Sequence, residues 1–278
     1  MSTIAETLTV CIQNQSDEAR VTQALLSVAE LGARVLIVDL FSEDQSFEAL
    51  RQTWEEAGRR PEDFEFVTRK WPSGARMREK AAALVKTRWL LWLHSDEWIE
   101  TDTQQWIQAH LEYLNPDHVY AFRRETLFLG RRVRRGGWYP DFQRRLYRLE
   151  HATWEEVTLP GGHATIDLVP NAQHGKTVAI DTHLGYLPYR DLAELDVRAE
   201  RDAEEWGKRL AEFWHGRKSK PSGKASQFLQ AASSFLDHYL LRAGFLDRKA
   251  GYHLAKGAAF RTKRRIEKAR DSYWNARR

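Results

Sequence analysis

Apolar residues in the first hundred positions follow two patterns that alternate along the chain. The segments 8–13 (LTVCIQ) and 33–40 (ARVLIVDL) are short apolar runs rich in branched side chains, which is typical of buried strands. Between them, segment 16–32 (SDEARVTQALLSVAELG) has apolar residues at helical spacing and ends on a glycine, a common helix stop. These three segments predict a β-α-β unit.

The alternation continues for two more rounds. The sequence predicts helices over 46–58 and 75–87, and strands over 64–69 and 89–94. Strands that alternate with helices favour an α/β fold with a mainly parallel sheet and helices on both faces. In such folds ligands bind at the carboxyl ends of the strands.

The pattern changes after residue 101. Strands are expected over 118–130 and within 151–187, and helical spacing dominates from about residue 189 onward. We therefore predict a sheet-containing domain over residues 6–190, followed by a helical, basic C-terminal region over residues 191–278.

Composition narrows the class of protein. Hydrophobic residues make up 42% of the chain and charged residues 29%, so a globular fold is expected. No apolar run reaches the length of a membrane span, and the first residues lack the features of a secretory signal. The single cysteine, Cys11, excludes an internal disulfide and fits a reducing compartment. A cytoplasmic protein is expected.

Positive charge is concentrated near the C-terminus. Residues 242–278 contain twelve Lys or Arg against three acids, a net charge of +9, whereas the whole chain carries +4. An apolar stripe runs just before this segment, at Phe228, Ala232, Phe235 and Tyr239. We consider two interpretations: peripheral attachment to an anionic membrane surface, the inner leaflet of a bacterial inner membrane, or a solvated helical face packed on the rest of the protein.

Acidic residues follow three of the predicted strands: Asp17 and Glu18 after the first, Asp39 and Asp44 after the second, and Asp96 and Glu97 after the fourth. Charges of this kind can simply mark the point where a strand reaches water. Carboxylates that converge at one edge of a sheet, however, repel one another unless a cation is present, and Mg²⁺ or Mn²⁺ bound with substrate phosphates is a common solution. This pattern favours a nucleoside-diphosphate ligand.

Several motifs resemble those of family 2 glycosyltransferases, which have the GT-A (Rossmann-like) fold. LTVCIQNQSDE, VDLFSED and HSDE stand where that family has its nucleotide-binding and metal-binding motifs. GGWYPD (136–141), YRDL (189–192) and GFLD (244–247) resemble the subgroup of lipopolysaccharide core β-1,4-glucosyltransferases. The resemblance covers nearly the whole chain, and GGWYPD is its most specific part. It implies transfer of a sugar from a nucleoside-diphosphate sugar to a glycan or lipid-linked acceptor of the bacterial cell surface, with inversion.

The resemblance also implies roles for particular residues. Asp96 would bind Mg²⁺ or Mn²⁺, and a uridine diphosphate sugar is the expected donor. The residues implied for the nucleotide-sugar site are Asp17, Glu18, Asp39, Arg78, His94 and Ser95. An inverting reaction needs a general base, for which the candidates are Asp141, Glu155 and Glu156.

Aromatic and basic side chains around GGWYPD suit an anionic glycan acceptor, namely Arg134, Arg135, Trp138 and Tyr139. Interleaved Arg and aromatic residues are also typical of nucleic-acid binders, but the acceptor interpretation accounts for the same cluster, and no nucleic-acid partner is expected.

The chain departs from the family pattern at several positions. His94 replaces the first Asp of the metal motif, Ser16 and Glu79 replace Asn residues, and TLPGG stands where a His-Glu pair would fall. A neutral imidazole does not supply the charge of a carboxylate. The alternative function is therefore a degenerate, non-catalytic protein that binds a sugar nucleotide or partners an active glycosyltransferase.

Overall fold

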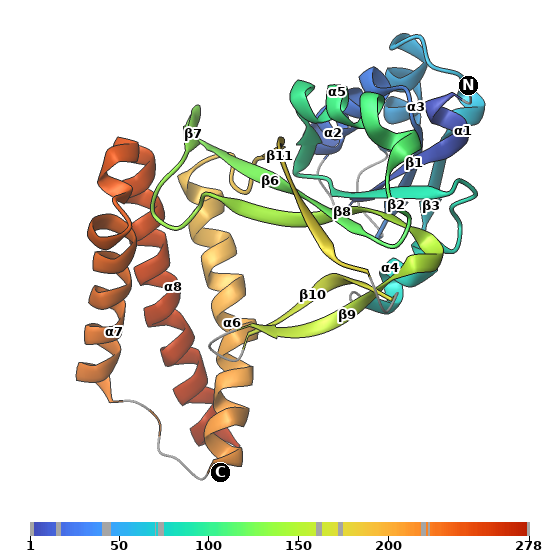
Figure 1. The fold of residues 1–278 in the computed structure, drawn as a ribbon. Helices are drawn as coiled ribbons and strands as arrows, with labels where there is room; N and C mark the ends of the chain where they lie inside the picture. The colour runs from blue at the N-terminus through green and yellow to red at the C-terminus, as the bar shows by residue number, and fades with distance from the viewer. Residues whose placement is uncertain are drawn as a thin grey trace. The chain divides into compact units, whose positions relative to one another are not determined.

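Four parallel strands form one half of the main sheet (Figure 1). The computed structural model describes residues 3–276 except 15–17, 41–45, 70, 72–74, 160–162, 172–174, 218–220 and 222. The parallel strands lie in the order β3-β2-β1-β4, with bounds β1 (Leu8–Asn14), β2 (Arg34–Asp39), β3 (Phe64–Thr68) and β4 (Trp89–His94). All four agree in position with the strands predicted from the apolar runs.

Antiparallel strands complete the sheet beyond β4. The order continues β8-β6-β11-β5, and β7 pairs with β6. Their bounds are β5 (Glu97–Ile99), β6 (Val119–Phe128), β7 (Arg131–Val133), β8 (Asp141–Arg148) and β11 (Thr177–Tyr186). A separate hairpin is formed by β9 (Ala152–Leu159) and β10 (His163–Pro170). Turns and short loops join β6, β7 and β8, as is usual for antiparallel strands, whereas the helix α5 (Thr101–His110) connects β5 to β6.

The chain forms two compact units. The first contains residues 1–124 and 141–186, and the second contains residues 125–140 and 187–278. The predicted α/β fold with a helical C-terminal region is confirmed. The domain limits expected from the sequence, 6–190 and 191–278, stay a prediction.

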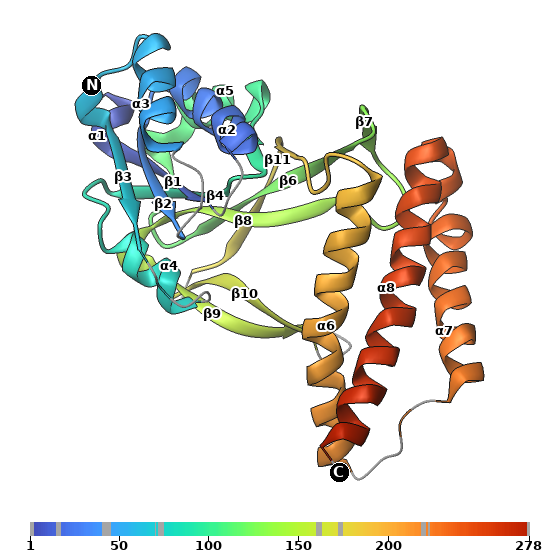
Figure 2. The same cartoon turned by 180° about the vertical axis from the view of Figure 1, so that it is seen from behind.

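Helices cover both faces of the parallel strands in the first unit (Figure 2). One face carries α2 (Glu18–Leu31), α3 (Ser46–Glu56) and α5 (Thr101–His110), whereas the other carries α4 (Ala75–Ala82) and the β9-β10 hairpin. A short α1 (Ile4–Thr7) precedes β1, and short 3-10 helices occupy Pro61–Asp63, Leu111–Tyr113 and Leu149–His151.

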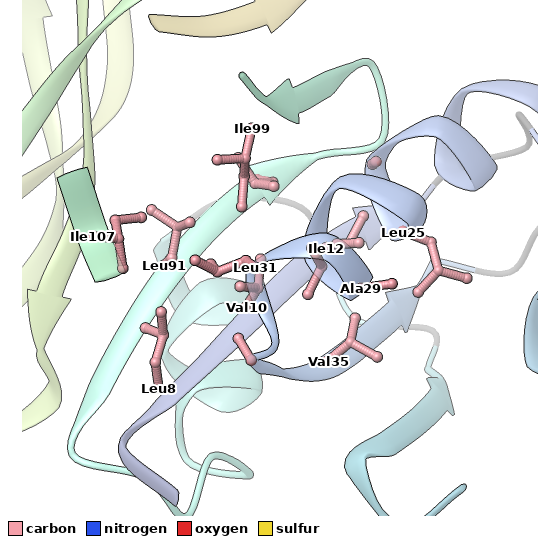
Figure 3. Close-up of a cluster of buried hydrophobic side chains, with 14 of the residues drawn as sticks. Leu8, Val10, Ile12, Leu25, Ala29, Leu31, Val35, Leu91, Ile99 and Ile107 are labelled. Atoms are coloured by element: carbon pink, nitrogen blue, oxygen red, sulfur yellow. The ribbon is translucent and has the colours of Figure 1, made fainter. Parts of the chain in front are cut away.

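Alternating side chains of β1 contribute to the two cores. Val10 and Ile12 point toward Leu25 and Ala29 of α2 (Figure 3), whereas Cys11 packs in the core on the opposite face. Each of these residues is buried. Full burial of a Val, Leu or Ile side chain stabilises a fold by about 1.5–3 kcal/mol, so this strand and helix alone anchor the unit.

Three helices form most of the second unit. They are α6 (Leu192–Gly216), α7 (Lys224–Leu236) and α8 (Arg248–Asn275), with a π-helical turn at Asp237–Leu241 and a 3-10 helix at Gly244–Asp247. In both views α8 lies between α6 and α7 (Figures 1 and 2), and it packs against each of them. The described helices include none that combines the length and the apolar composition of a transmembrane span.

The YRDL motif accounts for the start of α6. The Asp191 carboxylate accepts a hydrogen bond from the Glu194 amide at 2.8 Å, and the Glu194 carboxylate accepts one from the Arg190 amide at 2.7 Å. These bonds satisfy backbone donors that a helix start leaves without partners. Tyr189 is buried beside them and contacts the ring of Phe128 at a centroid distance of 5.9 Å.

Candidate functional site

The strand order creates a switch point between β1 and β4. From β1 the chain passes to β2 and β3 on one side, and it then returns across β1 to form β4 on the other side. In open α/β sheets, ligands commonly bind at such a point, at the carboxyl ends of the two strands. The residues at this edge are Gln13 and Asn14 of β1, Asp39 of β2 and His94 of β4.

Asp39 is held at this edge by a buried partner. The side-chain amide of Asn14 donates a hydrogen bond to Asp39 Oδ1 at 3.0 Å, and both residues are buried. A buried carboxylate is unfavourable without such bonds. The Asp39 carboxylate, which the resemblance assigns to the nucleotide-sugar site, therefore has a defined position next to the switch point.

A tight turn after β4 presents Ser95 and Asp96. The Ser95 amide donates to the Gln13 carbonyl at 2.9 Å, and the His94 amide donates to Glu97 Oε2 at 3.1 Å. Both turn residues keep partly exposed side chains. Asp96 is consequently a carboxylate at the carboxyl end of β4 that solvent reaches.

Glu97 lies at the centre of a buried ionic network. Its carboxylate accepts two hydrogen bonds from Arg145, at 3.0 and 2.7 Å, and one from Arg124 at 2.9 Å. Arg124 also bridges to Asp141 Oδ2 at 2.7–2.8 Å, and Gln143 donates to Asp141 Oδ1 at 2.6 Å. Burial raises the pKa of Glu97, but Arg145, His94 and Arg124 together outweigh burial and hold that pKa well below its usual range.

Arg78 and His94 form a second contact group at the same strand end. The Arg78 guanidinium lies 4.5 Å from the Trp154 ring centroid and 5.7 Å from that of Trp92, and its Nη2 atom is 3.5 Å from His94 Nε2. Burial lowers the pKa of His94 to about 3 and that of Arg78 to about 10. At neutral pH the imidazole is therefore uncharged and the guanidinium charged.

The side chains at this edge suit a cation that is held mainly by the phosphates of a bound substrate and by water. The described residues contain no group of three or more His, Cys, Asp or Glu side chains that could hold a metal ion by themselves. Mg²⁺, however, commonly binds through one or two carboxylates together with substrate phosphates and water, and Asp96 supplies one such carboxylate. His94 supplies no charge, since its Nε2 faces Arg78.

The remaining candidates for nucleotide binding and catalysis differ in their surroundings. Glu18 is exposed at the start of α2, and Glu155 is exposed on β9. Asp17, Asp44 and the side chain of Glu156 lie outside the described residues. Asp141 starts β8 and is connected through Arg124 to Glu97, whose carboxylate also accepts a hydrogen bond from the His94 amide.

The four residues expected to bind the acceptor belong to the second unit. The amides of Arg134 and Arg135 donate to Asp247 Oδ2 at 3.1 and 2.7 Å, and the Arg134 guanidinium contacts Glu125 at 2.9–3.0 Å. Trp138 is partly buried and meets the Tyr189 ring edge to face, while Tyr139 is partly exposed. Two motifs of the resemblance, GGWYPD and GFLD, therefore lie on contacting segments.

Glycine is required where these segments meet. Gly136 has φ +68°, and its amide donates to the Arg242 carbonyl at 2.9 Å. A Cβ on Gly244 would lie 2.4 Å from the His238 carbonyl oxygen, which no side chain tolerates. Packing thus accounts for the glycines of these two motifs without any ligand.

Sequence reasoning missed the partners of the acids. Asn14, Arg124, Gln143, Arg145 and Trp154 were not among the expected site residues. Little in the sequence signals these partners, because Arg124 and Arg145 each stand next to another arginine, and only the strand register decides which of the two meets Glu97. The identity of those partners required the sheet order.

Comparisons with known proteins bear on the family and the fold. The family model "Glycosyl transferase family 2" matches residues 7–166. The fold is similar to a mannosyltransferase from Pyrobaculum calidifontis in complex with GDP-Man and Mn²⁺, at 12% identity and a TM-score of 0.50, over 95% of this chain and 87% of that one. S. aureus TarS 1-349 in complex with UDP-GlcNAc gives 15% identity and a TM-score of 0.45, over 97% and 92% of the two chains. Because the family model covers more than half of the sequence, the chain belongs to glycosyl transferase family 2.

Proposed function

We propose that the protein transfers a sugar from a nucleoside-diphosphate sugar to a glycan or lipid-linked acceptor in bacterial cell-surface polysaccharide synthesis, with inversion. The observation that carries this proposal is the position of the matched family segment. Residues 7–166 include every described side chain at the switch point, from Asn14 and Asp39 to His94, Asp96 and Asp141. The lipopolysaccharide pathway and a uridine diphosphate donor follow from the motif resemblance.

The proposed roles follow from charge and position. Asp39, fixed by Asn14, accepts hydrogen bonds from the nucleotide base, and Asp96 would hold Mg²⁺ or Mn²⁺. The bound cation would supply positive charge to stabilise the leaving phosphate, and Arg78 adds a second positive charge at the same strand end. The mannosyltransferase of similar fold holds GDP-Man and Mn²⁺, which are the ligand classes proposed here.

Calorimetry with uridine diphosphate tests the nucleotide site. Asp39→Asn and Asp96→Asn preserve shape but remove charge, so each should weaken binding in Mn²⁺ by tenfold or more, the equivalent of about 1.4 kcal/mol. Glu55→Gln is the matched control, because the C-terminal turn of α3 lies at the opposite edge of the sheet. Wild-type binding that is unchanged by a chelator would show that Asp96 does not act through a metal.

Asp141 is the first candidate for the general base. Arg124 and Gln143 fix the orientation of its carboxylate, which favours a defined proton acceptor. Asp141→Asn should lower the transfer rate by about 10²–10⁴-fold and leave nucleotide affinity nearly unchanged. Single-turnover assays of Glu155→Gln and Glu156→Gln under the same conditions are the comparison, and full activity of Asp141→Asn would assign the base to one of these two.

A non-catalytic binding protein is the second candidate function. It is favoured by the neutral His94 imidazole, which stands where the family has a metal-binding carboxylate and which contacts Arg78. This alternative predicts tight nucleotide binding without product for any nucleotide sugar and membrane acceptor. Transfer activity that appears only in His94→Asp would identify the missing carboxylate as the cause.

A further inference from the structure

A groove with a volume of about 790 Å³ runs between α7 and α8 in the second unit. Its floor is apolar, with Phe228, Phe235 and Leu236 from α7 and Phe260 from α8. Phe228 is 73% exposed and Leu236 48% exposed. Large apolar side chains gathered at this exposure are unusual on a soluble surface and commonly mark an interaction site.

The apolar surface continues beyond the end of α7. In the π-helical turn Leu240 and Leu241 are 52% and 81% exposed, and the following 3-10 helix exposes Phe245 and Leu246. Helix α7 packs against α8, and in both views it lies on the side of α8 away from α6 (Figures 1 and 2). It is therefore an outer helix of its unit with an apolar side open to an occupant.

Basic side chains border the groove. Lys224, Lys256, Lys263 and Arg270 line it together with one acid, Glu267, so the lining carries a net charge of +3. Glu267 is paired with Arg264 at 2.7 Å. Within the part of the chain that the structure describes, none of the three lysines makes an ion pair.

The charges distinguish between two kinds of occupant. A second copy of this chain, placed symmetrically on the groove, would bring the same cations against one another, and such contacts are repulsive. An anionic bilayer presents phosphate groups to the lysines and acyl chains to the phenylalanine and leucine side chains. The combination of apolar floor and cationic border fits the bilayer.

We propose that the α7–α8 groove and its basic border are a docking surface for an anionic lipid bilayer. The apolar side chains of α7 enter the boundary between headgroups and acyl chains, while the lysines remain at the level of the phosphates. This inference goes beyond the proposed sugar transfer and uses none of the residues at the switch point, so each can fail without the other.

Vesicle flotation with the full chain provides the first test. The wild type should float with vesicles that contain phosphatidylglycerol and remain behind with vesicles of phosphatidylcholine alone, and binding should weaken with added salt. Lys256→Gln with Lys263→Gln should weaken binding roughly tenfold or more, because each basic residue near the surface contributes to attraction. Phe228→Ser with Phe260→Ser should also abolish flotation.

Matched substitutions on α6 serve as controls. Val197 is 67% exposed and Lys208 is also exposed, so Val197→Ser and Lys208→Gln change the same chemistry away from the groove and should leave binding unchanged. Unaltered thermal unfolding would show that each variant folds. Equal binding to both kinds of vesicle, absence of binding, or equal losses in the control variants would overturn the proposal.

An environment-sensitive thiol dye tests where the bilayer lies. Cys11 is fully buried, so a single introduced cysteine takes the label. Dye on Leu236→Cys should brighten and shift to shorter wavelength with anionic vesicles, whereas dye on Val197→Cys should not respond. The opposite pattern would show that another face binds. A vesicle-independent change that follows protein concentration would identify a second copy as the occupant, which also overturns the proposal.

Discussion

At the scale of single residues, Glu97 connects more side chains of the candidate site than any residue that was expected to bind the nucleotide sugar or to act in catalysis. Its carboxylate joins Arg145 and Arg124, and through Arg124 it reaches Asp141. Because Glu97 has no exposed surface, these bonds replace the water that the charge would otherwise require. The strand end is thereby held rigid beneath the turn that carries Asp96.

Replacing this carboxylate tests its structural role. Glu97→Gln leaves two arginines with a neutral partner, so we expect the free energy of unfolding in urea to fall by about 3 kcal/mol or more. Glu55→Gln removes an exposed i,i+4 ion pair with Arg51 and should cost less than about 0.5 kcal/mol. Similar losses in the two variants would mean that the network contributes no more than a surface pair.

At the scale of secondary-structure elements, α6 and α8 are joined by ion pairs and by a close approach of their backbones. Glu200 and Glu204 of α6 pair with Lys268 of α8 at 3.1 and 2.7 Å, and Glu200 also pairs with Arg264. Part of the positive charge predicted for the C-terminal region is therefore neutralised within its own unit. Just after Glu204 along the chain, the two helices approach closely at Gly207 of α6.

Gly207→Ala is expected to destabilise the protein even though alanine favours helix formation. An added Cβ would lie 2.7 Å from Lys268 Cβ and 3.1 Å from the Ala269 amide nitrogen, so the helices must separate, at a cost of about 1–3 kcal/mol. Gly216→Ala, near the end of the same helix, meets no atom within 4 Å and should be neutral or slightly stabilising. Thermal unfolding compares the two variants, and equal unfolding temperatures would contradict close packing at Gly207.

The contact between GGWYPD and GFLD gives a second prediction at this scale. Asp247→Ala removes the acceptor of the Arg134 and Arg135 amides, so the free energy of unfolding should fall by about 1–2 kcal/mol. Asp271→Ala, on the exposed side of α8, is the control and should change it by less than about 0.5 kcal/mol. Urea denaturation measures both, and no loss in Asp247→Ala would mean that water replaces the carboxylate.

At the scale of the whole molecule, the two units are proposed to bind different partners. Hydrogen exchange measures the protection of backbone amides by ligands in both units in one experiment. Uridine diphosphate with Mn²⁺ should slow exchange at the amides of Leu40 and Ser95, which lie at the carboxyl ends of β2 and β4, and leave α7 unchanged. Anionic vesicles should slow exchange in α7 and leave the amides of Leu40 and Ser95 unchanged. Slowing of α7 by the nucleotide alone would contradict the assignment of the sites to separate units.

The sequence by itself determined the features that depend on neighbouring residues. The apolar runs at 8–13, 33–40 and 89–94 identified the parallel strands, because a short continuous apolar run is typical of a strand that is buried on both faces. The same reasoning located Asp39 and Asp96 at strand ends, and the motif resemblance led to the family that the comparisons then established.

Only the tertiary structure decided which distant side chains meet. Glu97 pairs with residues 27 and 48 positions later, and Asp247 binds backbone amides 112 and 113 positions earlier. These pairs depend on the antiparallel strands that follow β4 and on the helices that return to the loop at 134–137. Local propensity carries no information on such pairings, because a charge is accepted in the interior only once the fold has brought its partner within hydrogen-bonding distance.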